Sequence, residues 1–407
     1  MNKMNIKSKF SLFNKNNAYK SIDIEMLPKE KINQNASWFQ SMEPINYAKN
    51  QTKELYEIDN IEVNEVDTKA FRDQFFKNLK TQMDEKKDLI KNKFLTTSDG
   101  PLNVGLNVIL IDSLLKVILK NSYFHILGSM DYQFSLIAVG GYGRGELAPH
   151  SDLDILFLLR NKLTKNDNKK IEKVIQLILY ILWDLGYTVG HSTRTVYDCI
   201  EKSKSDLTIS TSLLEKRFVA GNNQIFYLLN NEFNVFINNT KTLDFVNAKL
   251  KESDIRHNRF GGSRYVVEPN VKDGKGGLRD LHTLIWISKF AYKVDTISKL
   301  INIGALSKQE AVLFAEAQRF LLSVRCHLHY RAKREDDRLA MDAQLEIAKS
   351  MNFKNTITHK DVERFMKRYF IAAKTVGNLT RIFCAAIETE FNKPLRTSFL
   401  SFKKREN

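Results

Sequence analysis

Two aspartates separated by one residue stand where an apolar segment begins. Asp152 and Asp154 flank Leu153, and the chain continues as LDILFLL over residues 153–159. Side chains two positions apart in a strand point to the same face. At a separation of about 5.5 Å and an effective dielectric near 20, two such carboxylates repel by about 3 kcal/mol, so a neutralising partner is expected. Mg²⁺ binds carboxylate and phosphate oxygens and can clamp an in-line phosphoryl transfer. We therefore predict that Asp152 and Asp154 are catalytic metal ligands.

A glycine-rich segment precedes this pair and could hold phosphates. The apolar run FSLIAV at residues 134–139 leads into GGYGRG. Glycines let phosphates approach the backbone, and successive N–H groups in such a turn form an anion-binding nest. Arg144 is predicted to contact a triphosphate or the pyrophosphate leaving group, and Ser151 either bonds a phosphate oxygen or caps the turn. The predicted phosphate-binding residues are Gly140, Gly141, Gly143, Arg144 and Ser151.

Each motif alone has an ordinary explanation. A Gly-Gly turn is common, and a DxD pair can be a loop with Asx-turns. Here both occur together and the aspartates lead into a buried strand, which favours the catalytic reading. The segment contains no GxxxxGK[ST] phosphate loop, and GGYGRG does not fit a dinucleotide-binding GxGxxG.

A second glycine cluster precedes an apolar helix that begins near Leu278. Gly274, Gly276 and Gly277 could present helix N–H groups to an anion, with Lys275 and Arg279 adding charge. The alternative is a tight turn that Asp280 caps. Both readings remain open at this stage.

The apolar periodicity predicts which elements position these residues. Strands are expected at 134–139, 153–159 and 187–195, and helices at 68–94, 102–120, 174–185, 313–328 and 365–387. The SDGP sequence at 98–101 should separate the first two helices. Downstream of about residue 205 helix dominates, so a small α/β unit followed by a helical domain is predicted.

Composition narrows the class of protein further. The 407 residues suggest two or three packed units with an ample core, since 43% are hydrophobic. The net charge of +16 is spread along the chain, which makes nucleic acid an unlikely partner. Three distant cysteines favour neither disulfides nor zinc. No signal peptide and no apolar run long enough for a membrane span are evident, so a cytoplasmic protein without a membrane partner is expected.

Three blocks resemble one known family. GGYGRGELAPHSDLDILFL is similar to the active-site signature of bacterial PII uridylyltransferases, which belong to the polymerase-β-like nucleotidyltransferase superfamily. GGSRYVVEPNVKDGKGGLRDLHTLIWI (261–287) and VRCHLHYRAKREDDRL (324–339) resemble later parts of that family. The resemblance runs over residues 67–392. It implies transfer of UMP from UTP to a tyrosine hydroxyl of a PII signal protein, with Mg²⁺ and release of pyrophosphate.

The resemblance also implies an architecture. The fold class is α+β, with a polymerase-β-like core, made of a short mixed sheet and flanking helices, plus an all-helical domain. The expected divisions are a poorly ordered polar arm (1–65), a nucleotidyltransferase domain with N-terminal helices (66–220), a helical domain (221–395) and a basic tail (396–407). None of the eight histidines is followed by Asp, so the family's HD hydrolase domain, and with it the glutamine-sensing ACT domains, is expected to be absent.

The superfamily's third carboxylate has no obvious equivalent. The strand expected to carry it, GYTVGHSTRT, contains no acid, and the nearest candidates are Asp206 and Glu215. Either could instead be an ordinary surface residue. Two alternatives therefore stay open: a nucleotidyltransferase with another nucleotide or acceptor (protein adenylylation or an RNA end), and a non-catalytic nucleotide-binding remnant.

Overall fold

The computed structural model describes residues 42–51, 56–59, 69–128, 131–294, 297–355 and 360–391. Most of the predicted arm and the whole basic tail lie outside these residues. Where the arm is described, Pro44–Gln51 form a helix, α3, with Pro44 and Ala48 buried. Helix α3 packs against α5, so this part of the predicted arm belongs to the folded unit.

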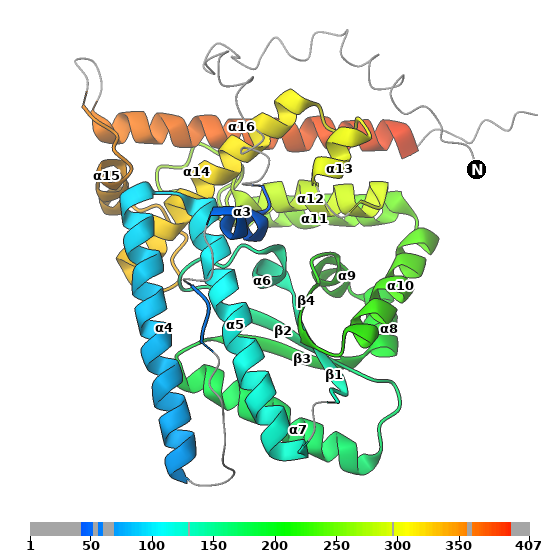
Figure 1. The fold of residues 1–407 in the computed structure, drawn as a ribbon. Helices are drawn as coiled ribbons and strands as arrows, with labels where there is room; N and C mark the ends of the chain where they lie inside the picture. Colours follow the sequence, from blue (N-terminus) through cyan, green and yellow to red (C-terminus); the bar gives the residue numbers. More distant parts are fainter. Residues whose placement is uncertain are drawn as a thin grey trace, which may run out of the picture.

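A four-stranded mixed sheet forms the centre of the lower part of the molecule (Figure 1). Its strands are β1 (Phe134–Ala138), β2 (Leu153–Leu159), β3 (Val189–Thr195) and β4 (Arg217–Gly221), in the order β3-β2-β1-β4. Strand β1 is antiparallel to β2 and β4, whereas β2 and β3 are parallel. The predicted mixed sheet is confirmed. Strand β4, in a region where helix was expected to dominate, is an addition.

Alternation along the central strands divides the hydrophobic core into two layers. Leu136 and Phe157 point to one face, where α5 and α7 cover them. Ile137 and Leu156 point to the other face, where α8 and α10 pack. Both strands are therefore buried on both faces, which explains why their sequences are continuously apolar. The covering helices are α5 (Gly100–Leu127), α7 (Lys165–Asp184), α8 (Val196–Ser205) and α10 (Asn223–Asn239).

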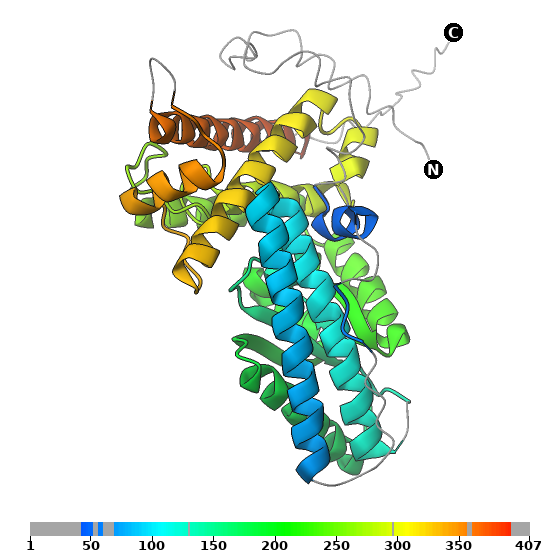
Figure 2. The same cartoon turned by 60° about the vertical axis from the view of Figure 1, so that its left-hand side comes forward.

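Two long antiparallel helices run beside the sheet and up into the helical part (Figure 2). They are α4 (Lys69–Thr97) and α5, and the predicted break between them is confirmed. Asp99 caps α5 by accepting a hydrogen bond from the Leu102 N–H. Helix α5 contacts α7 and β4 in the sheet unit and α14 in the helical unit, so it belongs to both.

The helical unit forms the upper part of Figure 1 around a core of its own. Its helices are α11 (Thr242–Arg259), α12 (Leu278–Tyr292), α13 (Ile297–Asn302), α14 (Lys308–Ala332), α15 (Met341–Ser350) and α16 (Asp361–Phe391). A third core joins it to the sheet: Phe245 of α11 stacks on Phe290 of α12 at 4.0 Å, and Ile137 and Leu156 of the sheet belong to the same cluster. The short helix α9 (Leu207–Leu214) lies at this boundary.

Two of the described helices are long and apolar enough by composition to cross a membrane. One covers Gly100–Phe124, and 83% of its most apolar window is buried in the fold. The other is α16, where 39% of that window is buried and residues such as Phe365 and Val376 pack in the helical core. Burial as extensive as that of the first helix is typical of core helices in globular proteins.

Candidate active site

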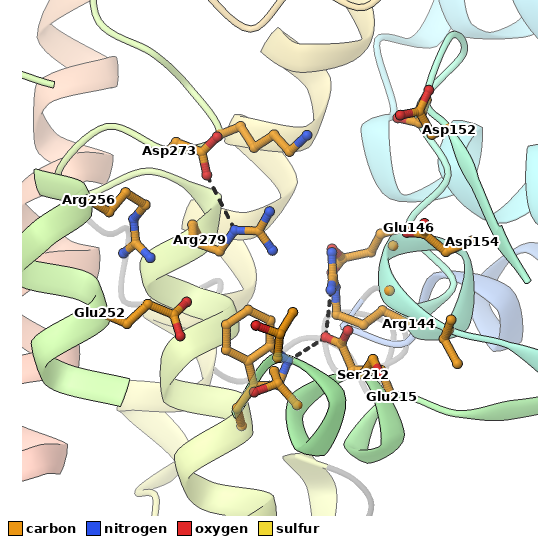
Figure 3. Close-up of a pocket in the computed structure, with 18 of the residues that line it drawn as sticks. Arg144, Glu146, Asp152, Asp154, Ser212, Glu215, Glu252, Arg256, Asp273 and Arg279 are labelled. Atoms are coloured by element: carbon orange, nitrogen blue, oxygen red, sulfur yellow. Dashed lines mark hydrogen bonds and ion pairs between the residues drawn. The ribbon is translucent and has the colours of Figure 1, made fainter. Parts of the chain in front are cut away.

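A cleft of about 970 Å³ opens between the sheet and the helical unit. One side, here called the sheet wall, contains Gly140, Gly141, Ser151, Asp152, Asp154 and Glu215. The opposite side, here called the helical wall, contains Lys249, Arg256, Arg259, Lys272, Arg279 and Arg325. Figure 3 shows Asp152 and Asp154 facing this helical wall across the opening. The sheet wall also contains Arg144 and Glu146, and the helical wall also contains Glu252, Asp273 and Glu335. The net charge is therefore negative on the sheet wall and positive on the helical wall.

Asp152 and Asp154 both line the cleft, as predicted from their spacing. Within the described residues, neither carboxylate forms a hydrogen bond or ion pair with another side chain. Burial raises the pKa of Asp154, and the neighbouring charge of Asp152 raises it further. The charges of Arg144 and Lys272 lower this pKa but do not outweigh these effects, so the pair carries negative charge that favours binding of a cation.

Two glycines make room for the Asp154 carboxylate. Gly140 has φ of +58°, which side chains rarely tolerate, and a Cβ there would overlap the carboxylate. In the parallel register between β2 and β3, Gly190 lies opposite Asp154, and a Cβ on it would approach Asp154 Oδ1 to 2.6 Å. Any other residue at either position would displace the carboxylate. Gly190 was not predicted, because only the strand pairing brings it to this site.

The glycine segment is a short helix, α6 (Gly140–Arg144), rather than an open turn. Gly140 and Gly141 line the cleft as predicted, but Gly143 does not. A Cβ on Gly143 would overlap the Glu215 carbonyl, so this glycine allows α6 to pack against the chain just before β4. The phosphate contact predicted for Gly143 is therefore corrected to a packing role.

Arg144 is held by two carboxylates. Its Nη1 donates to Glu215 Oε1 at 2.5 Å and its Nε to Glu146 Oε2 at 3.2 Å, and only 11% of the side chain is exposed. The Trp286 indole N–H also donates to Glu215 Oε1. Arg144 reaches the cleft, but its charge is already balanced by the chain.

Glu146 is the centre of a buried polar network that joins the two units. It accepts hydrogen bonds from His282 of α12 at 2.6 Å and from Gln318 of α14 at 2.7 Å, in addition to Arg144. Burial alone would raise the pKa of Glu146, but these partners outweigh it and hold that pKa well below its usual range. Burial lowers the pKa of His282 to about 3, so this histidine is neutral at pH 7.

The two candidates for a third carboxylate have different positions. Asp206 is exposed and caps α9 by accepting from the N–H groups of Thr208 and Ile209, and it does not line the cleft. Glu215 is buried in the sheet wall, so it is not an ordinary surface residue. Among the described residues, however, no three His, Cys, Asp or Glu side chains are grouped to hold a metal. Glu215 is therefore close to the aspartates without forming a triad with them.

The second glycine cluster is closed by its own aspartate. Asp280 accepts a hydrogen bond from the Gly276 N–H at 2.8 Å and pairs with Arg256 and His257. This matches the capping alternative. Lys275 donates to the Gly262 carbonyl at 3.2 Å and lies outside the main cleft, whereas Arg279 lines it. Of the two predicted anion contacts, only Arg279 therefore lies in the main cleft.

Ser151 lies in the sheet wall, and its hydroxyl accepts a hydrogen bond from Arg325 of α14 at 3.3 Å. Arg325, together with Trp286 and Lys249, was not predicted as part of the site. The first two lie in the sequence blocks at 324–339 and 261–287, and these blocks were the only signal that could have identified them. Lys249 could not be identified from the sequence, because it lies in a segment with the pattern of an ordinary charged surface helix.

Comparison with known proteins agrees with this arrangement. Residues 122–218, which contain the aspartates and the glycine segment, match the family profile "Nucleotidyltransferase domain". Residues 244–384, which provide the helical wall, match the profile "GlnD PII-uridylyltransferase". The chain belongs to the GlnD PII-uridylyltransferase family.

Curated relatives of this family are bacterial proteins named bifunctional uridylyltransferase/uridylyl-removing enzyme. The chain is 45% identical to the one from Azospirillum brasilense over 315 residues, which are 76% of this chain and 33% of that protein. It is 46% identical over 285 residues to the Rhodospirillum rubrum protein (69% and 30%) and 46% over 305 residues to that of Novosphingobium aromaticivorans (73% and 32%). The chain spans about a third of the length of these relatives.

Membership in this family bears on the metal. Nucleotidyltransferase domains generally use divalent metal ions. The two cleft-lining carboxylates, which have no side-chain partner among the described residues, suit such an ion. Two protein oxygens from Asp152 and Asp154 are a partial ligand set, and phosphate and water oxygens complete it in sites of this kind.

Proposed function

We propose that this chain is a Mg²⁺-dependent uridylyltransferase that transfers UMP from UTP to a tyrosine hydroxyl of a PII signal protein in the cytoplasm. The observation that carries the proposal is the pair of carboxylates, Asp152 and Asp154, which lack a side-chain partner among the described residues and lie beside Gly140 and Gly141 in a cleft whose other wall is net positive. The family supports the choice of UTP and a PII protein.

In the proposed reaction, the tyrosine oxygen attacks the α-phosphorus of UTP and the bond to the β-phosphate oxygen breaks. Uridylyl-tyrosine and pyrophosphate are formed, and the hydroxyl proton passes to solvent. Asp152 and Asp154 would hold Mg²⁺, which when bound neutralises charge on the phosphates. Gly140 and Gly141 let the phosphates approach the backbone. Glu215 holds Arg144 and thereby fixes the end of α6, so we assign it a positioning role.

The function is tested by incubating the chain with Mg²⁺, a PII protein and each of four α-³²P-labelled ribonucleoside triphosphates. We expect label on PII from UTP, and its loss with EDTA or when the acceptor tyrosine is replaced by phenylalanine. Labelling from ATP alone would overturn the uridylyl assignment and leave adenylylation. Labelling of RNA instead of PII would overturn the assignment of PII as the acceptor.

Gly190→Ala should lower the transfer rate about 10- to 100-fold, because a small misplacement of a reacting group can cost that much. Its Cβ would press on Asp154 Oδ1, while Gly190 lies in ordinary strand conformation, so the fold is expected to persist. Steady-state rates and circular dichroism check both points. The matched control is Thr193→Ala, an exposed position of the same strand that does not line the cleft. Equal rates for the Gly190 variant and the unaltered chain would contradict the role of Gly190 in making room for the Asp154 carboxylate.

A further inference from the structure

The proposed reaction needs a cation for the pyrophosphate that leaves, and the sequence offered Arg144 for this role. The structure shows that Arg144 already faces two carboxylates, Glu146 and Glu215, with little exposure to solvent. Using it for a phosphate would break a buried ion pair, which is costly. The cation for the phosphates must therefore come from elsewhere in the cleft.

Arg279 on the helical wall has the free donors that Arg144 lacks. Within the described residues, the side chain of Arg279 makes one ion pair, from Nε to Asp273 Oδ1 at 3.3 Å. Its two terminal amino groups are left without a protein acceptor. The side chain is 26% exposed and lines the cleft. Figure 3 shows Arg279 between Asp273 and the sheet wall, with its guanidinium in the opening.

The position of Arg279 is fixed by packing. Its guanidinium lies 5.6 Å from the Trp286 ring centre, and Trp286 is itself buried and bonded to Glu215. Lys249 Nζ lies 4.3 Å from the same ring centre. A planar guanidinium held in this way presents two parallel N–H groups, the geometry that matches phosphate oxygens.

The field around Arg279 also favours an anion. Burial lowers the pKa of Arg279, and the charge of Arg144 lowers it further. Burial lowers the pKa of Lys249 as well, with the charge of Arg279 contributing. Arginine stays protonated nonetheless. Arg144 is paired with Glu146 and Glu215, and Lys249 with Glu252, whereas Arg279 keeps terminal donors that face the cleft. An anion bound at Arg279 would relieve the remaining repulsion.

We propose that Arg279 binds the β- and γ-phosphates of the nucleoside triphosphate, so that the helical unit holds the pyrophosphate leaving group while the sheet wall holds the α-phosphate. This inference rests on the proposed function. It makes the helical unit part of the nucleotide site and not only a support for it.

The test is calorimetric binding of Mg²⁺-tripolyphosphate, UTP and UMP to the whole chain and to three variants. Arg279→Gln should weaken tripolyphosphate and UTP binding about 10- to 100-fold, as expected for a lost charge-assisted contact, and leave UMP binding unchanged. Arg279→Lys should restore part of the affinity. Asp273→Asn should tighten tripolyphosphate binding, because it removes the carboxylate that pairs with Arg279 and keeps the arginine. Thermal unfolding of each variant checks that it folds.

The Asp273 variant separates binding from structure. If the Arg279–Asp273 pair only stabilises the fold, both substitutions weaken binding alike, and the inference is wrong. It is also wrong if Arg279→Gln binds tripolyphosphate like the unaltered chain, or weakens only PII binding. A different result would overturn the proposed function. The unaltered chain would then transfer AMP or fail to label PII, while Arg279→Gln still weakened tripolyphosphate binding.

Discussion

Asp154→Asn should reduce nucleotidyl transfer by at least about 10³-fold and at the same time make the folded protein slightly more stable. Loss of one group that stabilises transition-state charge typically costs 10²–10³-fold, and here the metal ligand itself is lost. Stability should rise because the raised pKa of Asp154 shows that its charge is unfavourable in the fold. Because the pKa of Asp154 is higher in the folded than in the unfolded state, ionisation of this carboxyl group destabilises the fold. The destabilisation is complete above the folded-state pKa.

Two measurements check this prediction together. Steady-state transfer to PII gives the rate, and urea unfolding at pH 7 without metal gives the stability. Asp184→Asn is a matched control, because Asp184 is exposed at the end of α7 and does not line the cleft. A variant that lost both activity and stability would show that Asp154 supports the fold. Full activity would remove the basis of the catalytic proposal.

Glu146→Ala should destabilise the protein by about 3–5 kcal/mol, the range observed when one partner of a buried ion pair is removed. The substitution leaves Arg144 with Glu215 alone and takes the acceptor from His282 and Gln318. Because these partners come from α12 and α14, the loss affects the contact between the two units. Transfer should fall too, since Arg144 and α6 lose one of their anchors.

Urea unfolding of Glu146→Ala, of the isosteric Glu146→Gln and of Glu172→Ala gives the comparison. Glu172 is exposed on α7, so its loss should change stability by less than about 0.5 kcal/mol. The stability of Glu146→Gln should lie between those of Glu146→Ala and Glu172→Ala, since glutamine keeps the shape of the side chain and one acceptor oxygen. If Glu146→Ala is as stable as Glu172→Ala, the network does not hold the units together.

The sequence predicted the elements that depend on local pattern. Periodicity and capping residues predicted strands β1 and β2, the break at Asp99 and the helices α4, α5 and α7. The predicted ends of α4 lie within a few residues of the observed ends, whereas those of α5 and α7 differ by more. Asp152 and Asp154 could be predicted to lie together because the pair stands where an apolar strand begins, although Asp152 itself precedes β2 by one residue. The family resemblance then supplied the reaction.

Features that depend on distant contacts could not be predicted. Strand β4 is five residues long, and it forms because it pairs with β1, more than seventy residues earlier in the chain. The role of Gly190 depends on a parallel register set across the whole of α7. Arg144 looked like a phosphate ligand because nothing local shows that Glu215 and Glu146 converge on it. The sequence did offer Arg279 as an anion contact, but only the structure places it in the same cleft as the two aspartates with donors left free.

Helix α5 ties the two walls of the cleft to each other. Its 28 residues extend about 42 Å at 1.5 Å per residue, and it packs against α7 and β4 in the sheet unit and α14 in the helical unit. Because one continuous helix is packed in both units, we expect the width of the cleft to change little on binding. The proposed acceptor tyrosine would then have to reach the site on a narrow segment, such as a loop.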